Sequence, residues 1–194
     1  MSNLRLRVLF VCMGNICRSP AAEAVFRQQI EARGLGVHFE ADSAGTGGWH
    51  AGDGPDARMV TAASARGIRV EGVARQVHHR DLDAFDHIIC MDSDNLVQVQ
   101  SMGQGRAEVS LMLSHHPDDS TVEVPDPYYG DLKGFEQARE PFAKHRLTLK
   151  RRHGNVALPL EEDLTQPQEE VTLVLGELLL RDALDDEHAH AAAD

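Results

Sequence analysis

The stretch from residue 8 to residue 20, VLFVCMGNICRSP, constrains the fold of this chain more than any other. Residues 8–11 are all apolar and are typical of a buried strand. Ser19 and Pro20 are typical of a helix start, with serine as the cap and proline in the first helical position. A strand and a helix joined by a short loop direct several backbone N–H groups and the positive end of a helix dipole at one point. The stretch therefore predicts an anion site at the end of a strand.

The loop inside this stretch carries the residue types that such a site needs. Gly14 and Asn15 tolerate the left-handed backbone that a tightly curled loop requires. Cys12 follows the strand directly, where N–H dipoles and a guanidinium favour a thiolate. Arg18 offers a planar fork that matches two oxygens of a phosphate. A lone cysteine is more often a small core residue, but this combination predicts a nucleophile beside a bound oxyanion.

The rest of the sequence alternates between strand and helix patterns. The expected strands are residues 4–11, 37–43, 87–91 and, more loosely defined, 107–113. The expected helices are residues 20–33, 55–66 and 93–102, the last capped by Ser93, with a helical turn at 82–85. This alternation predicts an α/β three-layer sandwich with a central, mostly four-stranded parallel sheet and helices on both faces. Ligands of such sheets bind beyond the carboxyl ends of the strands, where Cys12 lies.

Composition and charge exclude several other classes of protein. The 194 residues suffice for one domain, no apolar run is as long as a membrane span, and the N-terminus MSNLRLR lacks the apolar core of a signal peptide. Three cysteines, an odd number, form no disulfide framework. Residues 161–194 hold 11 of the 31 acidic residues and one arginine, so the net charge of −12 belongs mainly to the tail. The basic run at 150–152 is too short to indicate nucleic-acid binding. We expect a soluble cytoplasmic protein that binds neither membranes nor nucleic acid.

Five stretches, in order along the chain, resemble the low-molecular-weight protein tyrosine phosphatases. They are VCMGNICRSPAAEAVF at 11–26, DSAGTGGWH at 42–50, GDGPDARM at 52–59, DHIICMDSDNL at 86–96 and PDPYYGDLKGFE at 125–136. The resemblance covers about residues 5–137. It implies an enzyme that hydrolyses phosphotyrosine in proteins or small aryl phosphates and releases inorganic phosphate. It also implies a monomer or weak dimer that needs neither a cofactor nor a metal.

The resemblance assigns the chemistry to four residues. Cys12 attacks phosphorus and forms a cysteinyl-phosphate intermediate, while Arg18 holds the phosphate oxygens. Ser19 donates a hydrogen bond to the cysteine sulfur, which assists its departure in the second step. Asp126, between two prolines that keep its loop extended, protonates the leaving oxygen and then acts as base toward water.

The same resemblance implies supporting roles around these four. The phosphate-binding loop comprises Met13, Gly14, Asn15, Ile16, Cys17 and Arg18. Residues expected to brace this loop without touching the substrate are Asn15, Ser43 and Asp92. Residues expected to form the walls of the substrate cleft are Trp49, Tyr128 and Tyr129. We also expect Cys17 to be able to trap an oxidised Cys12 as a reversible disulfide, with a buried structural thiol as the alternative.

The sequence departs from the family pattern at two places. The family often has a histidine that braces the loop asparagine about three residues before its Ala-Arg-Gln motif; here that position is Gly72, which puts the stability of the loop in doubt. Beyond residue 137, Pro141 interrupts the helix with which the family ends. We therefore divide the chain into a phosphatase domain, 1–140, and a divergent acidic segment, 141–194. In that segment a helix over 168–185 packs back on the domain, or the segment is largely disordered, as its end is expected to be.

Three other functions are weighed against the phosphatase. An arsenate reductase of the same fold needs a relay of thiols, and no cysteine follows Cys90. Relatives that resemble protein-arginine phosphatases carry threonine at the position of Ile16. Isoleucine instead offers apolar surface suited to a phenyl ring, which favours phosphotyrosine over phosphoarginine as the substrate. A non-catalytic phosphate-binding module would not need Cys12, Arg18 and Asp126 together.

Overall fold

The computed structural model describes residues 5–115, 123–128, 146–150 and 170–174. Within them, one four-stranded sheet has the strand order β2-β1-β3-β4, and each neighbouring pair is parallel. Its strands are β1 (Leu6–Cys12), β2 (Phe39–Gly45), β3 (His87–Cys90) and β4 (Glu108–Leu111). The helices are α1 (Arg18–Ala32), α2 (Ala57–Ser64), α3 (Asp81–Ala84) and α4 (Ser93–Ser101), with a 3₁₀ turn, η1 (Met112–His115). The expected α/β fold is confirmed.

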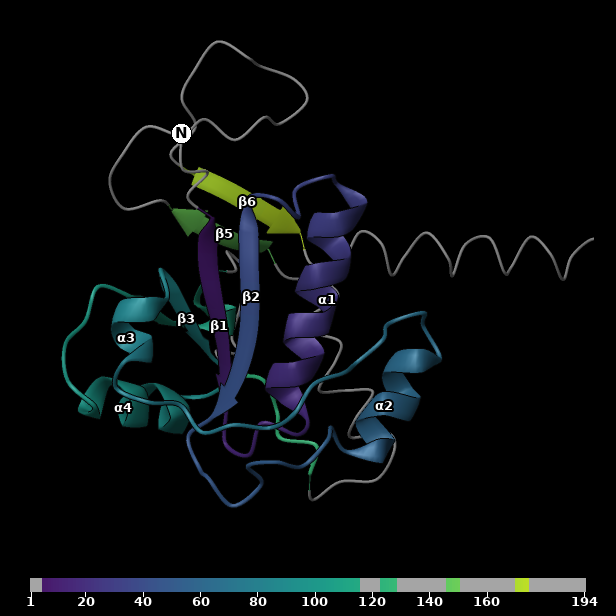
Figure 1. The fold of residues 1–194 in the computed structure, drawn as a ribbon, viewed down its shortest axis with the longest axis horizontal. Helices are drawn as coiled ribbons and strands as arrows, with labels where there is room; N and C mark the ends of the chain where they lie inside the picture. Colours follow the sequence, from purple (N-terminus) through teal and green to yellow (C-terminus); the bar gives the residue numbers. More distant parts are fainter. Residues whose placement is uncertain (1–4, 116–122, 129–145, 151–169, 175–194) are drawn as a thin grey trace, which may run out of the picture.

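Helices cover both faces of the sheet, with α1 on one side and α3 and α4 on the other (Figure 1). The strand β1 explains this arrangement, because its side chains alternate between the two faces. Val8 and Phe10 are buried in the cluster that contains Phe26 of α1. Leu9 and Val11 are buried in a second cluster that contains residues of α3 and α4. A strand that is apolar at every position therefore occupies the centre of a three-layer sandwich.

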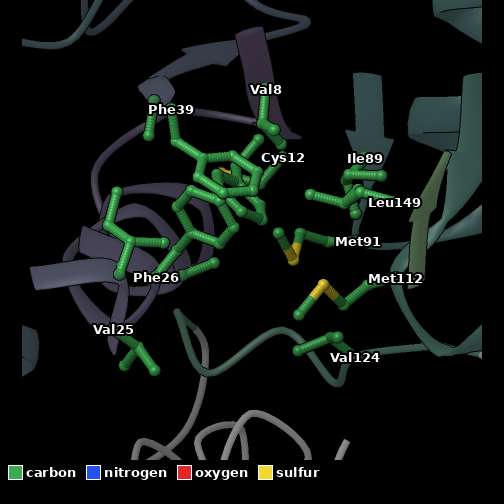
Figure 2. Close-up of a cluster of buried hydrophobic side chains, with 14 of the residues drawn as sticks. Val8, Cys12, Val25, Phe26, Phe39, Ile89, Met91, Met112, Val124 and Leu149 are labelled. Atoms are coloured by element: carbon green, nitrogen blue, oxygen red, sulfur yellow. The ribbon is translucent and has the colours of Figure 1, made fainter. Parts of the chain in front are cut away.

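Three phenyl rings pack against one another in the cluster on the α1 side, and those of Phe26 and Phe39 are labelled in Figure 2. The centroids of Phe10 and Phe26, and those of Phe26 and Phe39, are each 5.6 Å apart. Burial of each ring contributes about 2–3 kcal/mol. Leu149, from the strand β5 (Arg146–Lys150), is buried in the same cluster. The core that supports the sheet thus includes a residue beyond position 140.

At two helix starts, the serine that the sequence predicts as the cap is not the cap. The expected cap Ser19 lies inside α1, which begins at Arg18, and no side chain caps that helix. The carboxylate of Asp92, rather than the hydroxyl of Ser93, caps α4 by accepting the backbone N–H of Asn95 at 2.8 Å. Aspartate accepts with two oxygens and a full charge, which favours it at a helix N-terminus. The hydroxyl of Ser19 does not cap α1, because it bonds to Cys12 and Asn15 instead, as described below.

The helix expected over 168–185 is wrong for residues Glu170–Val174, which form the strand β6. This strand pairs antiparallel with β5. Its sequence, EVTLV, is rich in β-branched residues, which favour strands, and they outweigh the helical spacing of the apolar positions. The other positions of that expected helix, and the end expected to be disordered, lie outside the described residues. The division at 140 stays a prediction. Among the described residues, every helix is too short or too polar to span a lipid bilayer.

Candidate active site

The parallel strands bring the site residues to one edge of the sheet. Cys12 is the last residue of β1 and pairs with Gly45 at the end of β2, while Asp92 follows the end of β3. The segment 123–128, called the acid loop below, reaches the same edge because the backbone N–H of Val124 donates to the carbonyl of Met91 at 2.8 Å. The sulfur of Cys12 and the carboxylate of Asp126 therefore meet although 114 positions separate them.

The thiol of Cys12 is buried and has two hydrogen-bond partners. The hydroxyl of Ser19 lies 3.0 Å from the sulfur, and the backbone N–H of Asn15 donates to it at 3.3 Å. The same hydroxyl oxygen accepts a hydrogen bond from the Asn15 side chain at 2.9 Å, which leaves its proton available to the sulfur or to the carbonyl of Ala44 at 3.3 Å. Donors directed at sulfur stabilise a thiolate, so the arrangement suits a nucleophile.

Asn15 holds the loop through all of its side-chain polar groups. Its amide nitrogen donates to Ser19 and to Ser43, each at 2.9 Å, and its amide oxygen accepts from the backbone N–H of Arg75 at 2.9 Å. Its φ of 55° is in the left-handed region, as expected from the sequence. Gly14 does not share that conformation. It matters for space instead, because a Cβ there would lie 3.1 Å from the ring of His50.

A backbone N–H group braces the side chain of Asn15 in place of the histidine that the family often has. Gly72 has a φ of 116°, and three residues later the backbone of Arg75 supplies the donor to Asn15. The guanidinium of Arg75 fixes this segment by bonding to Asp42 at 2.8 Å and to Asp81 at 2.9 Å. A small cavity of about 80 Å³ lies beside Gly72 and reaches the loop asparagine. The asparagine is thus braced without a side chain at position 72.

Arg18 is 3% exposed and lies between two carboxylates. Its guanidinium bonds to Asp92 at 2.6 Å and to Asp126 at 2.5 Å, and it also donates to the carbonyl of Val124 at 3.1 Å. Asp92 therefore supports the arginine directly, besides capping α4. Asp126 is the more exposed of the two carboxylates, with 27% of its side chain accessible against 19% for Asp92.

A cleft of about 380 Å³ opens over the cysteine. Its lining residues are Cys12, Met13, Gly14, Ile16, Cys17, Arg18, Trp49, His50, Asp126 and Tyr128. The expected wall residues Trp49 and Tyr128 are both present, and Trp49 is 67% exposed. Tyr129, the third expected wall residue, lies outside the described residues. Apolar and aromatic side chains line the cleft beside Cys12, which suits a flat phenyl ring.

His50 is a cleft residue that the sequence prediction missed. Its ring is 6.3 Å from the Tyr128 ring, centroid to centroid, and its Nδ1 lies 3.0 Å from a carboxylate oxygen of Asp53. The signal that could have identified it is its position directly after Trp49 in a glycine-rich loop. Such a loop carries both neighbouring side chains to the same rim.

Cys17 and Ile16 lie at the boundary between the loop and the core. Burial raises the pKa of the Cys17 thiol to about 12, and the nearby carboxylate of Asp56 adds to this shift. Both side chains pack in a small cluster with Met59 of α2. They also line the cleft. Ile16 therefore both fills space under the loop and presents apolar surface to a ligand.

A model of the family described as low molecular weight phosphotyrosine protein phosphatase matches residues 7–153 of this chain. The chain belongs to this family. A low molecular weight protein-tyrosine-phosphatase from Streptomyces coelicolor is 43% identical over 139 residues, which are 69% of this chain and 85% of that protein. Its human counterpart, a low molecular weight phosphotyrosine protein phosphatase, is 40% identical over 133 residues, 66% of this chain and 84% of that protein.

Solved structures agree with the family assignment. The protein tyrosine phosphatase from Entamoeba histolytica, with Hepes in its active site, is 39% identical with a TM-score of 0.67, and the match covers 70% of this chain and 88% of that one. An arginine phosphatase from drosophila is 30% identical with a TM-score of 0.67, and the match covers 70% of this chain and 90% of that one. The family match extends to 153, past the five sequence motifs, and so includes β5 of this phosphatase.

Proposed function

We propose that this chain is a phosphotyrosine-protein phosphatase that hydrolyses aryl phosphate monoesters through a cysteinyl-phosphate intermediate. One observation carries the proposal: the sulfur of Cys12, the guanidinium of Arg18 and the carboxylate of Asp126 line the same cleft. Relatives that are 40–43% identical are named protein-tyrosine phosphatases, which supports the same activity. We further propose a cytoplasmic protein that acts as a monomer or weak dimer.

The first step forms the intermediate. The phosphate oxygens accept hydrogen bonds from the loop N–H groups and from Arg18, which Asp126 releases as its carboxylate takes a proton from solvent. The Cys12 thiolate attacks phosphorus, so an S–P bond forms while the bond from phosphorus to the aryl oxygen breaks. The leaving oxygen takes the electron pair of that bond and receives a proton from Asp126.

The second step releases inorganic phosphate. The Asp126 carboxylate takes a proton from a water molecule whose oxygen attacks phosphorus. The S–P bond breaks and its electron pair returns to Cys12. The Ser19 hydroxyl, 3.0 Å from the sulfur, and the Asn15 N–H, 3.3 Å away, stabilise the thiolate that leaves. The same two donors therefore serve the nucleophile in the first step and the leaving group in the second.

The alternatives are less well supported by the residues of the cleft. A thiol relay of the arsenate reductase type needs a second thiol near Cys12 and a path outward. Cys90 is fully buried in the cluster on the α4 side of the sheet, whereas Cys12 belongs to the cluster on the α1 side. Cys17 is close but has a pKa raised to about 12, which makes it a weak nucleophile at neutral pH. A phosphate-binding module without catalytic activity would not need the carboxylate of Asp126 beside the guanidinium of Arg18.

The substrate experiment compares phosphotyrosine with phosphoarginine, because one structural neighbour is named an arginine phosphatase. Ile16 and Tyr128 offer the cleft apolar and aromatic surface, which packs against a phenyl ring. We expect kcat/KM on a phosphotyrosine peptide to exceed that on a matched phosphoarginine peptide. Ile16→Thr should narrow the gap by placing a hydroxyl in the cleft. Preference of the unmodified enzyme for phosphoarginine would overturn the tyrosine assignment and leave the cysteine chemistry in place.

A further inference from the structure

A second hollow, of about 410 Å³, adjoins the cleft and shares three residues with it, Met13, Arg18 and Asp126. Its remaining lining comes from Asp92, from one side of α4 and from the start of the acid loop. None of the steps above uses it. Because Arg18 lines both spaces, a substrate whose phosphate binds in the cleft can reach the second hollow with groups that neighbour the phosphate.

The lining of this hollow is strongly acidic. The carboxylates that line it belong to Asp92, Asp94, Glu123 and Asp126, and Arg18 is the single cation among its described lining residues. Arg18 is already bonded to two of those carboxylates. Glu123 accepts hydrogen bonds from the backbone N–H and the hydroxyl of Ser93, which hold the pKa of its carboxyl below the usual range. The hollow is therefore negative beside a site that binds an anion.

An independent feature of the same wall indicates a ligand that donates hydrogen bonds. Asn95 lines the hollow and is 1% exposed. Its backbone N–H donates to Asp92, but its side-chain oxygen has no hydrogen-bond partner among the described residues. A buried acceptor without a donor is unfavourable, so most such atoms in proteins have a partner. A donor from a ligand would satisfy this buried oxygen once the Asn95 side chain turns it toward the hollow that the residue lines.

We propose that this acidic hollow binds an arginine or lysine side chain of the substrate protein, a few residues from its phosphotyrosine. The inference rests on the proposed function and names its substrate class: phosphotyrosine segments with a basic neighbour. A guanidinium or ammonium group carries only donors and a positive charge, which matches the carboxylates and the unpartnered oxygen of Asn95. The same charges exclude a second phosphate or an acidic side chain from the hollow.

Matched phosphotyrosine peptides test the inference on the unmodified enzyme. One set places arginine, alanine or glutamate singly at each position from three before to three after the phosphotyrosine. At one position or more, arginine should raise kcat/KM about fivefold over alanine, and glutamate should lower it, since a partly exposed ion pair contributes on the order of fivefold in affinity. The difference should shrink as salt is added. Equal kcat/KM for arginine and alanine at every position overturns the inference and leaves the proposed function intact.

A charge-reversal pair locates the effect. Asp94→Lys changes the hollow at an exposed residue of α4, and Glu31→Lys makes the same charge change at the far end of α1. Asp94→Lys should abolish or reverse the preference for arginine, and Glu31→Lys should keep it. Equal loss in both variants would assign the preference to the net charge of the protein and overturn the role of the hollow. Failure of the unmodified enzyme to cleave any phosphotyrosine peptide would overturn the proposed function itself.

Discussion

The two loops that meet at Arg18 are built in different ways. The phosphate loop takes its proposed nucleophile, its arginine and its bracing serine and asparagine from residues 12–19, and its buried polar atoms bond to one another and to Ser43. The acid loop reaches the site from 108 positions away, through the contacts of Glu123, Val124 and Asp126. Its acid is partly exposed, whereas Asn15 and Ser19 are buried. We therefore expect the phosphate loop to be fixed in place before substrate arrives and the acid loop to be the adjustable half of the site.

The largest effect is expected at the nucleophile. Cys12→Ser should lower kcat by on the order of 10⁶-fold, as loss of a catalytic nucleophile does in other hydrolases. Binding of inorganic phosphate should persist, because the loop N–H groups and Arg18 remain. Calorimetric titration with phosphate and a turnover assay check the two halves of the statement. Turnover near that of the unmodified enzyme would remove Cys12 from the mechanism.

A smaller loss of kcat is expected when Asp126 of the acid loop is replaced, and its size should depend on the leaving group of the substrate. Asp126→Ala should lower kcat about 10²–10⁴-fold for leaving groups that need a proton. The loss should shrink for leaving groups that depart as stable anions. A series of aryl phosphates with different phenol acidities measures this dependence. An equal loss across the series would mean that Asp126 positions the substrate rather than protonating it.

The third substitution removes hydrogen bonds within the phosphate loop and leaves the reacting atoms unchanged. Asn15→Ala removes the bonds to Ser19, Ser43 and the backbone of Arg75. Leaving those buried partners unsatisfied should cost about 2–4 kcal/mol of unfolding free energy. The loss in kcat should be the same for every leaving group, unlike that of Asp126→Ala. Urea denaturation and the same aryl phosphate series test it, and a leaving-group dependence would contradict the division between the two loops.

The smallest effect concerns the second thiol of the fixed half. Peroxide should oxidise Cys12, and Cys17 should then trap it as a disulfide that dithiothreitol reverses. The Cys17→Ser enzyme should regain about half as much activity or less. The pKa of Cys17, raised to about 12, adds a condition: trapping should become faster as pH rises, because the attacking thiolate becomes more abundant. Equal recovery by both proteins would leave Cys17 as a structural residue.

The same pKa shift has a consequence for stability. Burial raises the pKa of Cys17 in the folded state to about 12, whereas the pKa of an unfolded cysteine lies near the ordinary value of 9.0. The unfolded state therefore binds fewer protons between those values, and stability should fall as pH rises through that window. Cys90, with a pKa also raised to about 12 by burial, adds to the same trend.

Prediction from sequence succeeded where structure is local and failed where it depends on distant partners. The Cys12 loop and the strands around it follow from residue types within one short stretch, so the fold could be predicted. Ser19 was expected both to cap the helix and to bond to Cys12; the contact with Cys12 is present, but the cap is not, because the sequence alone cannot show that the hydroxyl also bonds to Asn15. Likewise, the residue at position 72 gave no hint that the backbone of Arg75 would brace the loop. The strand β6 was missed because its partner β5 lies some twenty positions earlier.

The contact between Arg18 and Asp126 means that the free enzyme contains its own competitive inhibitor. In the proposed cycle, Asp126 gives up its proton in the first step and becomes an anion tethered beside the guanidinium that it bonds in the free enzyme. A tethered group competes at a high effective concentration, which for a short tether is on the order of millimolar. Once hydrolysis has ended and the acid has returned its proton to solvent, that carboxylate displaces the bound phosphate. Product release is thus assisted by the residue that began the reaction, and each turnover resets the site for the next substrate.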